Sequence, residues 1–442
     1  MLHRVRYLAA VLALGLFACA EPASSPVEAP TWTRDVAPLV HQHCLPCHLP
    51  DGPAPFALAT HRDVSRRGRQ VVEVVRTGFM PPWLPDDRGP ALRGRRGLTE
   101  EEVEVLAAWV AAGAPQGDGP DPTPPAAEPW PLGEPDLVLE GEGWVDIPPE
   151  GDGILHTVVL PASLGEERDL VAVQLRPSTP RALHGVGWLF DRTGYGPAAD
   201  AGYPGPGFRE MGGVGMNTIG ALGAWAPGRA ALPLPGEHGF RVGGDGAFLV
   251  QLHLKGTGKP ERERPSLGLY FAEEPRSRPV MDLIMGSLCV DIPAGDPEYL
   301  VTDELVLPVS TELVGLYPKA RYLCSRMVVR AEAPDGTVEV LLSISDYDFN
   351  WLEPFWYEEP VQLAAGTRLL LEFVYDNSSG NLRNPSHPPQ RAGLGRDADD
   401  EMAFLMLYLA PDEASDLEVL EALHQQGFRD RIEARRAWQE GR

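Results

Sequence analysis

The chain has 442 residues, which exceeds one ordinary domain and predicts two or three separate hydrophobic cores. Its 63 acidic residues outnumber its 38 lysines and arginines, giving a formal net charge of −25. This charge argues against nucleic acid as a partner and against a body that lies on an anionic membrane surface.

The N-terminus has the pattern of an export signal. Basic residues precede an apolar run over residues 7–17 that is too short for a permanent membrane span. The run leads to Cys19 in a sequence that resembles a bacterial lipobox, in which the cysteine is acylated. We therefore predict a lipoprotein signal peptide over residues 1–19 and a flexible tether over 20–30. A plain cleaved signal with an incidental cysteine is the alternative. The expected location is the cell envelope, as a periplasmic or outer-surface lipoprotein tethered to a membrane.

Cys44, Cys47 and His48 form the attachment signature of a c-type haem. In this arrangement the two thiols bond to the porphyrin, and the adjacent imidazole reaches the iron from the same turn. A zinc site would need a second pair of ligands, and none follows nearby. The remaining alternative is a disulfide turn followed by a chance histidine. The sequence predicts one haem c, attached through both cysteines with His48 as an axial ligand.

Residues 31–115 have the size and pattern of a small all-α, class I-like cytochrome c module. Helices are expected near residues 35–40, over 61–76 and over 99–113, where Thr99 begins a capping box. A Pro-rich stretch over 116–135 is typical of a stiff linker.

Met80 is the candidate for the sixth iron ligand. It lies on a short loop between Gly78 and two prolines, and a Met/His ligand pair gives a relatively high reduction potential. A core-filling methionine is the structural alternative. Three nearby histidines compete for the same role: His41, His43 and His61.

Residues 62–96 contain nine arginines against four acidic residues. On a chain this acidic, such a basic segment could attract an acidic electron-transfer partner or could bind the acidic remainder of the chain itself. Ordinary solvated surface charge explains the composition equally well.

From residue 137 to 409 the chain reads as short strands between Gly and Pro turns. This spacing, without intervening helices, predicts two antiparallel, jelly-roll-like β-sandwich domains, over residues 136–280 and 281–411. Residues 412–442 return to helical composition and predict a short C-terminal helix. The clearest expected strands are residues 157–160, 170–175, 248–254, 338–344 and 368–375.

Several motifs resemble the bacterial relatives of copper type II, ascorbate-dependent monooxygenases, the class that contains peptidylglycine α-hydroxylating monooxygenase. Many of these bacterial proteins also carry a cytochrome c ahead of their β domains. The resemblance covers about residues 31–409. The motifs that carry it are residues 251–260 and 267–271 for the N-terminal half, and 315–318, 346–351, 375–381, 384–389 and 400–402 for the C-terminal half.

The resemblance implies two copper ions, one in each sandwich. One relays electrons through histidines, and the other, held by a His-x-His pair and a methionine, binds oxygen and abstracts hydrogen. Met402 stands at the position of that methionine, but the His-x-His pair falls on Lys319 and Arg321. These two cations do not ligate Cu(I) at neutral pH.

The electron-relay site is also incomplete. His184 keeps the first member of the family's histidine pair, Gly185 replaces the second, and His253 is kept on a later strand. Lys255 stands where a further histidine is often found. Residual copper at His184, His253 and Met402 is therefore doubtful, and the two histidines are better explained as remnants of a lost site.

Cys289 and Cys324 remain after the haem and lipid cysteines are assigned. Export makes them a candidate disulfide. Two free buried thiols are the alternative.

Three functions are compatible with these patterns. The first is an anchored haem protein that exchanges single electrons with a redox partner protein or a small reductant, with the β body kept as a platform. The second is an active copper monooxygenase that hydroxylates an unknown substrate and receives its electrons from haem. The third is a binding subunit of a larger envelope complex.

Overall fold

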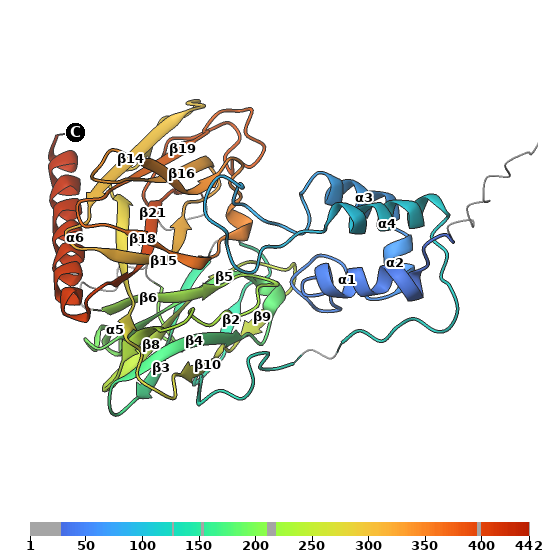
Figure 1. The fold of residues 1–442 in the computed structure, drawn as a ribbon, viewed down its shortest axis with the longest axis horizontal. Helices are drawn as coiled ribbons and strands as arrows, with labels where there is room; N and C mark the ends of the chain where they lie inside the picture. The colour runs from blue at the N-terminus through green and yellow to red at the C-terminus, as the bar shows by residue number, and fades with distance from the viewer. Residues whose placement is uncertain (1–27, 126–127, 152–153, 210–217, 396–398, 442) are drawn as a thin grey trace, which may run out of the picture.

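A computed structural model describes residues 28–125, 128–151, 154–209, 218–395 and 399–441. The chain forms an N-terminal helical unit and a larger body of β-sheets, with a long helix on the outer side of the body (Figure 1). The prediction of a mainly β chain that ends in a helix is confirmed. Within the described residues, no helix has both the length and the apolarity needed to cross a membrane.

The helical unit packs around two buried tryptophans, Trp32 and Trp109, whose rings lie 6.2 Å apart. Its last helix begins at the predicted capping box, in which Thr99 and Glu102 each accept a hydrogen bond from the other's backbone N–H. The elements of this unit are η1 Trp32–Val36, α1 Ala37–His43, α2 His61–Ser65, α3 Gly68–Arg76 and α4 Glu100–Ala111.

The single helix expected over residues 61–76 is instead divided into α2 and α3. Arg67 leaves the helical conformation, with φ −114° and ψ 8°. Gly68 then lies against α4, where an added Cβ would be 2.9 Å from a methyl carbon of Val110. The close approach of α3 to α4 at Gly68 therefore breaks the helix that the sequence pattern predicts as continuous.

The first half of the body consists of a five-stranded and a four-stranded sheet, consistent with a β-sandwich. All pairings are antiparallel except that of β11 with β7. The five-stranded sheet has the order β1 (Leu137–Glu140), β10 (Ser266–Phe271), β4 (Arg168–Arg176), β7 (His238–Val242), β11 (Arg278–Pro279). The four-stranded sheet has the order β3 (Ile154–Ser163), β8 (Asp245–Leu254), β5 (Leu183–Asp191), β6 (Thr218–Trp225). Two short strands, β2 (Val145–Ile147) and β9 (Glu261–Glu263), pair with each other. The other small elements are η2 (Pro180–Ala182) and α5 (Tyr195–Ala201).

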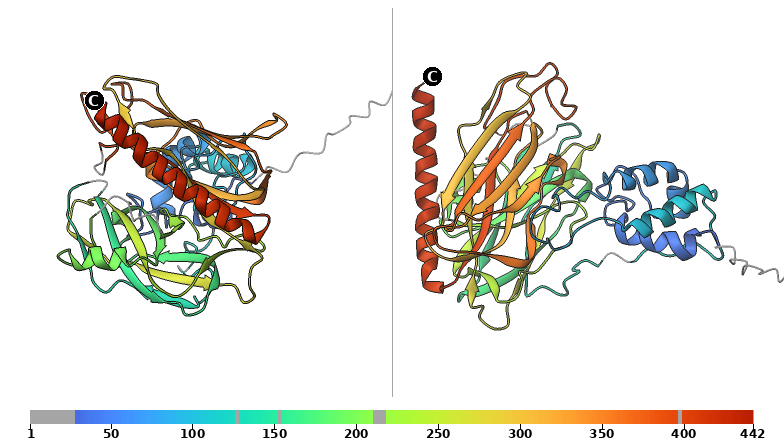
Figure 2. Two further views of the ribbon diagram at one scale, coloured as in Figure 1. Left: turned by 90° about the vertical axis from the view of Figure 1, so that its left-hand side faces the viewer. Right: turned by 45° about the horizontal axis from the view of Figure 1, so that its top comes forward.

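The second half consists of two four-stranded antiparallel sheets, again consistent with a sandwich. One has the order β12 (Met281–Ser287), β21 (Ala403–Pro411), β15 (Thr311–Lys319), β18 (Phe355–Leu363). The other has the order β14 (Tyr299–Val306), β19 (Arg368–Tyr375), β16 (Cys324–Glu332), β17 (Val338–Ile344). Two short strands, β13 (Asp291–Ile292) and β20 (Ala392–Gly393), pair with each other. The other small elements are η3 (Phe349–Trp351) and η4 (Ala414–Asp416). The C-terminal helix α6 (Leu417–Glu440) lies across the side of the body that faces away from the helical unit (Figure 2).

Residues 83–96, between α3 and α4, form an arm that lies on the second half of the body (Figure 1). Leu92 forms a β-bridge with Tyr357 of β18, and the backbone N–H of Arg93 donates to the carbonyl of Trp356 at 2.8 Å. Backbone hydrogen bonds therefore fix part of the helical unit to the body.

Candidate functional site

The segment from Cys44 to His48 forms a compact turn directly after α1. The backbone N–H groups of Cys47 and His48 both donate to the carbonyl of Cys44, at 3.2 and 3.0 Å. The two thiols are free and are not bonded to each other. Removal from solvent raises the pKa of Cys44 to about 12, so its sulfur is a neutral thiol at neutral pH.

His48 has one ring nitrogen already engaged. Its Nδ1 lies 2.8 Å from the carbonyl oxygen of Phe56, and the two rings lie 4.8 Å apart. Burial, with a smaller effect of the nearby Arg67 cation, lowers the pKa of His48 and favours the neutral imidazole. A neutral ring that donates from Nδ1 has its lone pair on Nε2, which is the arrangement that a metal-binding histidine needs.

Cys44, Cys47, His48 and Met80 all line one cavity of about 700 Å³. This volume is within the range of sites that bind cofactors and drug-sized ligands. The backbone N–H of Met80 donates to the carbonyl of Val74 at 3.0 Å, which ties the methionine loop to α3. The structure thus brings the predicted attachment turn and the predicted sixth ligand together around one space.

Two of the three competing histidines, His41 and His61, do not line the cavity. His41 and His61 pack edge-on against Trp32, with ring centroids 6.3 and 6.1 Å from it. His43 does line the cavity, but its Nε2 lies 3.3 Å from a carboxylate oxygen of Glu102. The thioether is therefore the better placed of the candidate sixth ligands.

The β body forms one wall of this cavity. The first half supplies His184 of β5, Gly228 of the loop after β6, and Lys255, while the second half supplies Trp351 of η3. A Cβ added to Gly228 would collide with the sulfur of Cys47, and the φ of +74° also favours glycine. Local sequence patterns do not indicate this wall, because its residues come from four segments far apart in the chain.

A buried ion pair network lies beside the cavity. Glu353, which is fully buried, binds Arg96 of the arm through one carboxylate oxygen and Arg229 through the other, the latter at 2.8 Å. The three side chains come from the helical unit, the first half of the body and the second half. The network therefore joins all three parts of the chain at one point.

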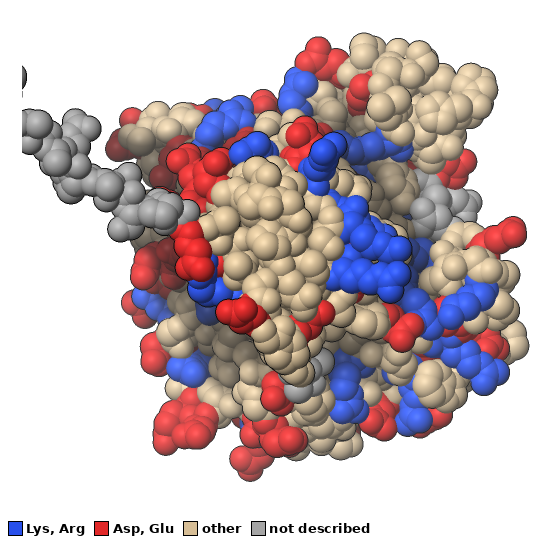
Figure 3. Space-filling model, turned by 90° about the vertical axis from the view of Figure 1, so that its right-hand side faces the viewer, with Lys and Arg blue, Asp and Glu red and all other residues tan. Residues whose placement is uncertain are grey.

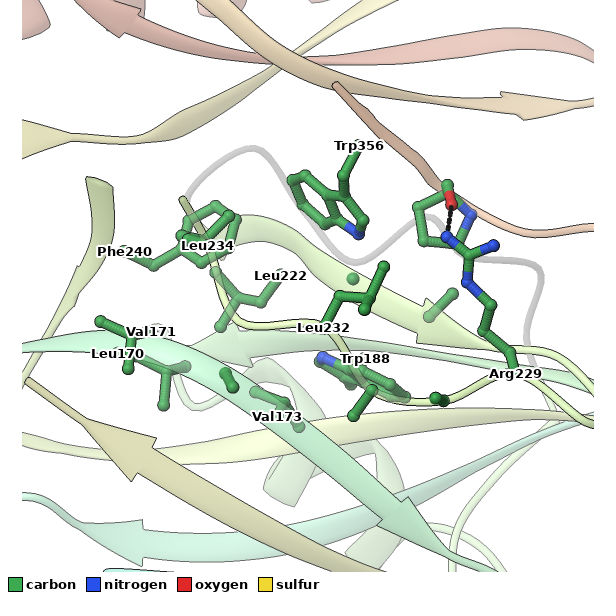
Figure 4. A pocket seen from close by; sticks show the side chains of 16 residues that line it. Leu170, Val171, Val173, Trp188, Leu222, Arg229, Leu232, Leu234, Phe240 and Trp356 are labelled. Atoms are coloured by element: carbon green, nitrogen blue, oxygen red, sulfur yellow. Dashed lines mark hydrogen bonds between the residues drawn. The ribbon is translucent and has the colours of Figure 1, made fainter. Parts of the chain in front are cut away.

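A second, much smaller cavity of about 40 Å³ lies between the two halves of the body (Figure 4). Its walls are mainly apolar and include Trp188 and Trp356. Arg229 lies at its edge and donates to the carbonyl of Pro354 at 3.4 Å. This cavity has room for little more than a water molecule.

The residues at the copper-ligand positions lie largely inside the body. His184 and His253 are buried, and their rings lie 5.9 and 6.4 Å from that of Phe349. Burial lowers the pKa of His253 well below its usual value, and the nearby cations Lys319 and Arg321 lower it further. His253 is therefore neutral at neutral pH, and it is close to positive charge.

These donors do not fit a copper ion. Burial, together with the neighbouring Arg321, lowers the pKa of Lys319 to about 8, so the ammonium form is still present at neutral pH. Gly185 offers no side chain, and Met402 is buried with its carbonyl accepting a hydrogen bond from Tyr375 at 2.7 Å. In the described ranges, no group of three or more His, Cys, Asp or Glu side chains is arranged to hold a metal ion.

Cys289 and Cys324 are both free thiols, so the disulfide considered from the sequence is not formed. Cys324 begins β16, whereas Cys289 follows β12, and these strands belong to different sheets. The proposed lipid-anchor residue Cys19 lies outside the described residues.

Comparisons with known proteins identify no family. No family model matches the chain, and no curated protein sequence matches it. Among solved structures, the major capsid protein P2 from bacteriophage PM2 is 10% identical, with 63% of this chain and 98% of that chain covered and a TM-score of 0.23. PNGF-II is 9% identical, with 63% and 65% covered and a TM-score of 0.27. These scores are too low to support an argument about fold or function.

Proposed function

We propose that this chain is an exported, membrane-anchored c-type cytochrome that carries one haem and exchanges single electrons. The observation that supports this most directly is the hydrogen bond from His48 Nδ1 to the Phe56 carbonyl, inside a cavity that also contains Cys44, Cys47 and Met80. This arrangement leaves Nε2 free for an iron ion and places a thioether in the same space.

The residues present fit a haem c. Cys44 and Cys47 would hold it covalently, and His48 and Met80 would be its axial ligands. When bound, haem supplies a reversible one-electron change at iron. The chain's own contribution is to fix the His48 tautomer through Phe56 and to limit water at the site with the wall supplied by the body.

The β body is, in this proposal, a copper-monooxygenase-like platform without its oxygen-binding copper site. The motifs of the sequence support the relationship, while Lys319, Arg321 and Gly185 oppose metal binding. An active monooxygenase would need copper. We expect metal analysis of the purified protein to give one iron and no copper per chain, and two coppers per chain would overturn this part of the proposal.

Covalent haem attachment is the decisive test. The protein is produced in a bacterium that matures c-type cytochromes, and the denatured protein is examined by gel haem staining and by its pyridine haemochrome spectrum. We expect covalent haem in the natural chain and none in the double variant Cys44→Ser, Cys47→Ser. Cys289→Ser is the matched control, since this thiol lies outside the cavity, and it should keep the haem. A natural chain without covalent haem would refute the proposal.

The anchor is tested separately. Cys19→Ser should move the protein from the membrane fraction to the soluble fraction of the cell envelope without loss of haem. Unchanged membrane association would contradict the lipid anchor and leave the haem assignment intact.

A further inference from the structure

The buried ion pair network beside the cavity has an excess of positive charge. Arg96 of the arm and Arg229 of the first half share the single carboxylate of Glu353, so the three side chains together carry one uncompensated positive charge. Their side chains are 18%, 7% and 0% exposed, in that order. Charges so far from water are weakly screened, so their field extends into the neighbouring cavity.

Arg96 connects the network to the methionine loop. Its Nε donates to the carbonyl of Pro82 at 2.7 Å, and Pro82 follows Met80 by two residues. Arg96 and Met80 also line the same cavity. One end of the network therefore lies beside the proposed sixth iron ligand.

Arg229 places the other end of the network beside the attachment turn. It lines the cavity and directly follows Gly228, at which an added Cβ would collide with the Cys47 sulfur. Burial raises the pKa of Cys47, and the charges of Arg96 and Glu353 act on the same thiol. The network is therefore within electrostatic reach of a group that lies between Cys47 and the methionine loop.

The other charged side chains around the cavity do not cancel this excess. Among the described residues that line it, the further cations are Arg67, Arg95 and Lys255, and the acidic residue is Asp348. Figure 3 shows Lys and Arg gathered on one side of the helical unit, although the chain as a whole has a net charge of −25. The cavity is thus a positively charged site within an acidic protein.

We propose that the network of Arg96, Arg229 and Glu353 tunes the proposed haem, and that its excess positive charge raises the reduction potential. This rests on the proposed haem function and gives the β body, which supplies Arg229 and Glu353, a part in it. Reduction removes one positive charge from the iron of a haem, so a fixed cation nearby favours the reduced form. Because the three side chains come from three parts of the chain, this field depends on the body lying against the helical unit.

Substitutions of opposite sign test the charge directly. The midpoint potential of the haem-loaded full chain is measured by spectroelectrochemical titration at neutral pH. In Arg229→Gln, which removes a positive charge, we expect the ratio of reduced to oxidised protein at a given applied potential to fall about tenfold, which is about 59 mV for one electron. Glu353→Gln removes the negative charge and should raise this ratio by a similar factor.

The opposite signs separate a charge effect from a structural one. Water that enters a disturbed site would lower the potential in both variants, because solvent access also tunes a haem. A lower potential in both variants would therefore overturn the proposal, as would an unchanged potential in both. Asp348→Asn is the second variant that should raise the potential, and it is used if Glu353→Gln does not fold. Arg96→Gln is the second variant that should lower it.

The matched controls are Arg429→Gln and Glu433→Gln. Both residues are exposed on α6, at the opposite side of the body from the helical unit, and the two substitutions change the net charge by the same amounts. The controls should leave the potential unchanged, and shifts equal to those of the network variants would show a bulk charge effect and overturn the proposal. Failure of the haem assignment is distinguishable, because it appears as a natural chain without covalent haem.

Discussion

Gly228, in the loop after β6, makes room for the sulfur of Cys47 at the proposed haem-attachment turn. A Cβ at this position would collide with that sulfur, and the backbone φ of +74° is one that glycine adopts without strain. The contact joins the helical unit to the first half of the body across a large separation in sequence. The proposed haem site therefore includes residues of the β body as well as the helical unit that carries the attachment motif.

Gly228→Ala should therefore lower the free energy of unfolding more than an ordinary glycine substitution does. Gly244→Ala is the matched control, because its φ is +75° but nothing lies within 4 Å of the added Cβ. We expect the control to lose about 1 kcal/mol of unfolding free energy, and Gly228→Ala to lose about 1–3 kcal/mol more because of the collision. Urea unfolding measures both, and equal losses would contradict the contact.

Met80→Ala should remove the long-wavelength thioether–iron charge-transfer absorption of the oxidised protein and lower its reduction potential, while covalent haem is retained. The reason is that Met80 is the thioether that shares the cavity with His48. Met281→Ala, in β12 of the body, should leave the spectrum unchanged. An unaltered spectrum in Met80→Ala would point to His43 instead, which also lines the cavity.

Glu353→Gln should destabilise the chain strongly, since it leaves Arg96 and Arg229 beside each other without their shared carboxylate. Removing one partner from a buried charge network costs about 3–5 kcal/mol of unfolding free energy. Asp87→Asn is the control, because its pair with Arg95 is exposed and contributes about 1 kcal/mol or less. Urea unfolding again measures the difference, and similar losses in the two variants would show that the buried network contributes little.

The ion pair of Glu261 with Arg181 should make stability dependent on acid pH. The hydrogen bond from Arg181 lowers the pKa of Glu261 from 4.5 to about 2, against a smaller opposing effect of burial. A carboxyl whose pKa is lowered on folding contributes stability above its unfolded pKa and loses it as pH falls toward its folded pKa. We expect this contribution to be about 1–2 kcal/mol at pH 6 and to decline below about pH 4.5, allowing for partial solvent screening.

Glu261→Gln tests this directly. The variant should be less stable than the natural chain at pH 6, and the gap between them should narrow at pH 3.5. Thermal unfolding at both pH values gives the comparison. If the stability difference between the variant and the natural chain stays constant with pH, the charge of the Glu261 carboxylate is not the cause of that difference.

Local patterns allowed accurate predictions where neighbours in sequence decide the structure. The capping box at Thr99 depends on residues three positions apart, and it is present. The strands expected over 338–344 and 368–375 coincide with β17 and β19. The helix over 61–76 was predicted incorrectly as continuous, because its break depends on the approach of α4 at Gly68.

In the candidate site, too, local sequence determines one part and tertiary packing determines the other. The turn from Cys44 to His48 is closed by hydrogen bonds within five residues, so the sequence by itself determines the grouping of both thiols with the imidazole. Only the tertiary structure decided that Met80 shares their cavity and that Gly228 makes room for the Cys47 sulfur. Those outcomes depend on how the arm and the body pack together, and packing between distant segments has no signature in local sequence.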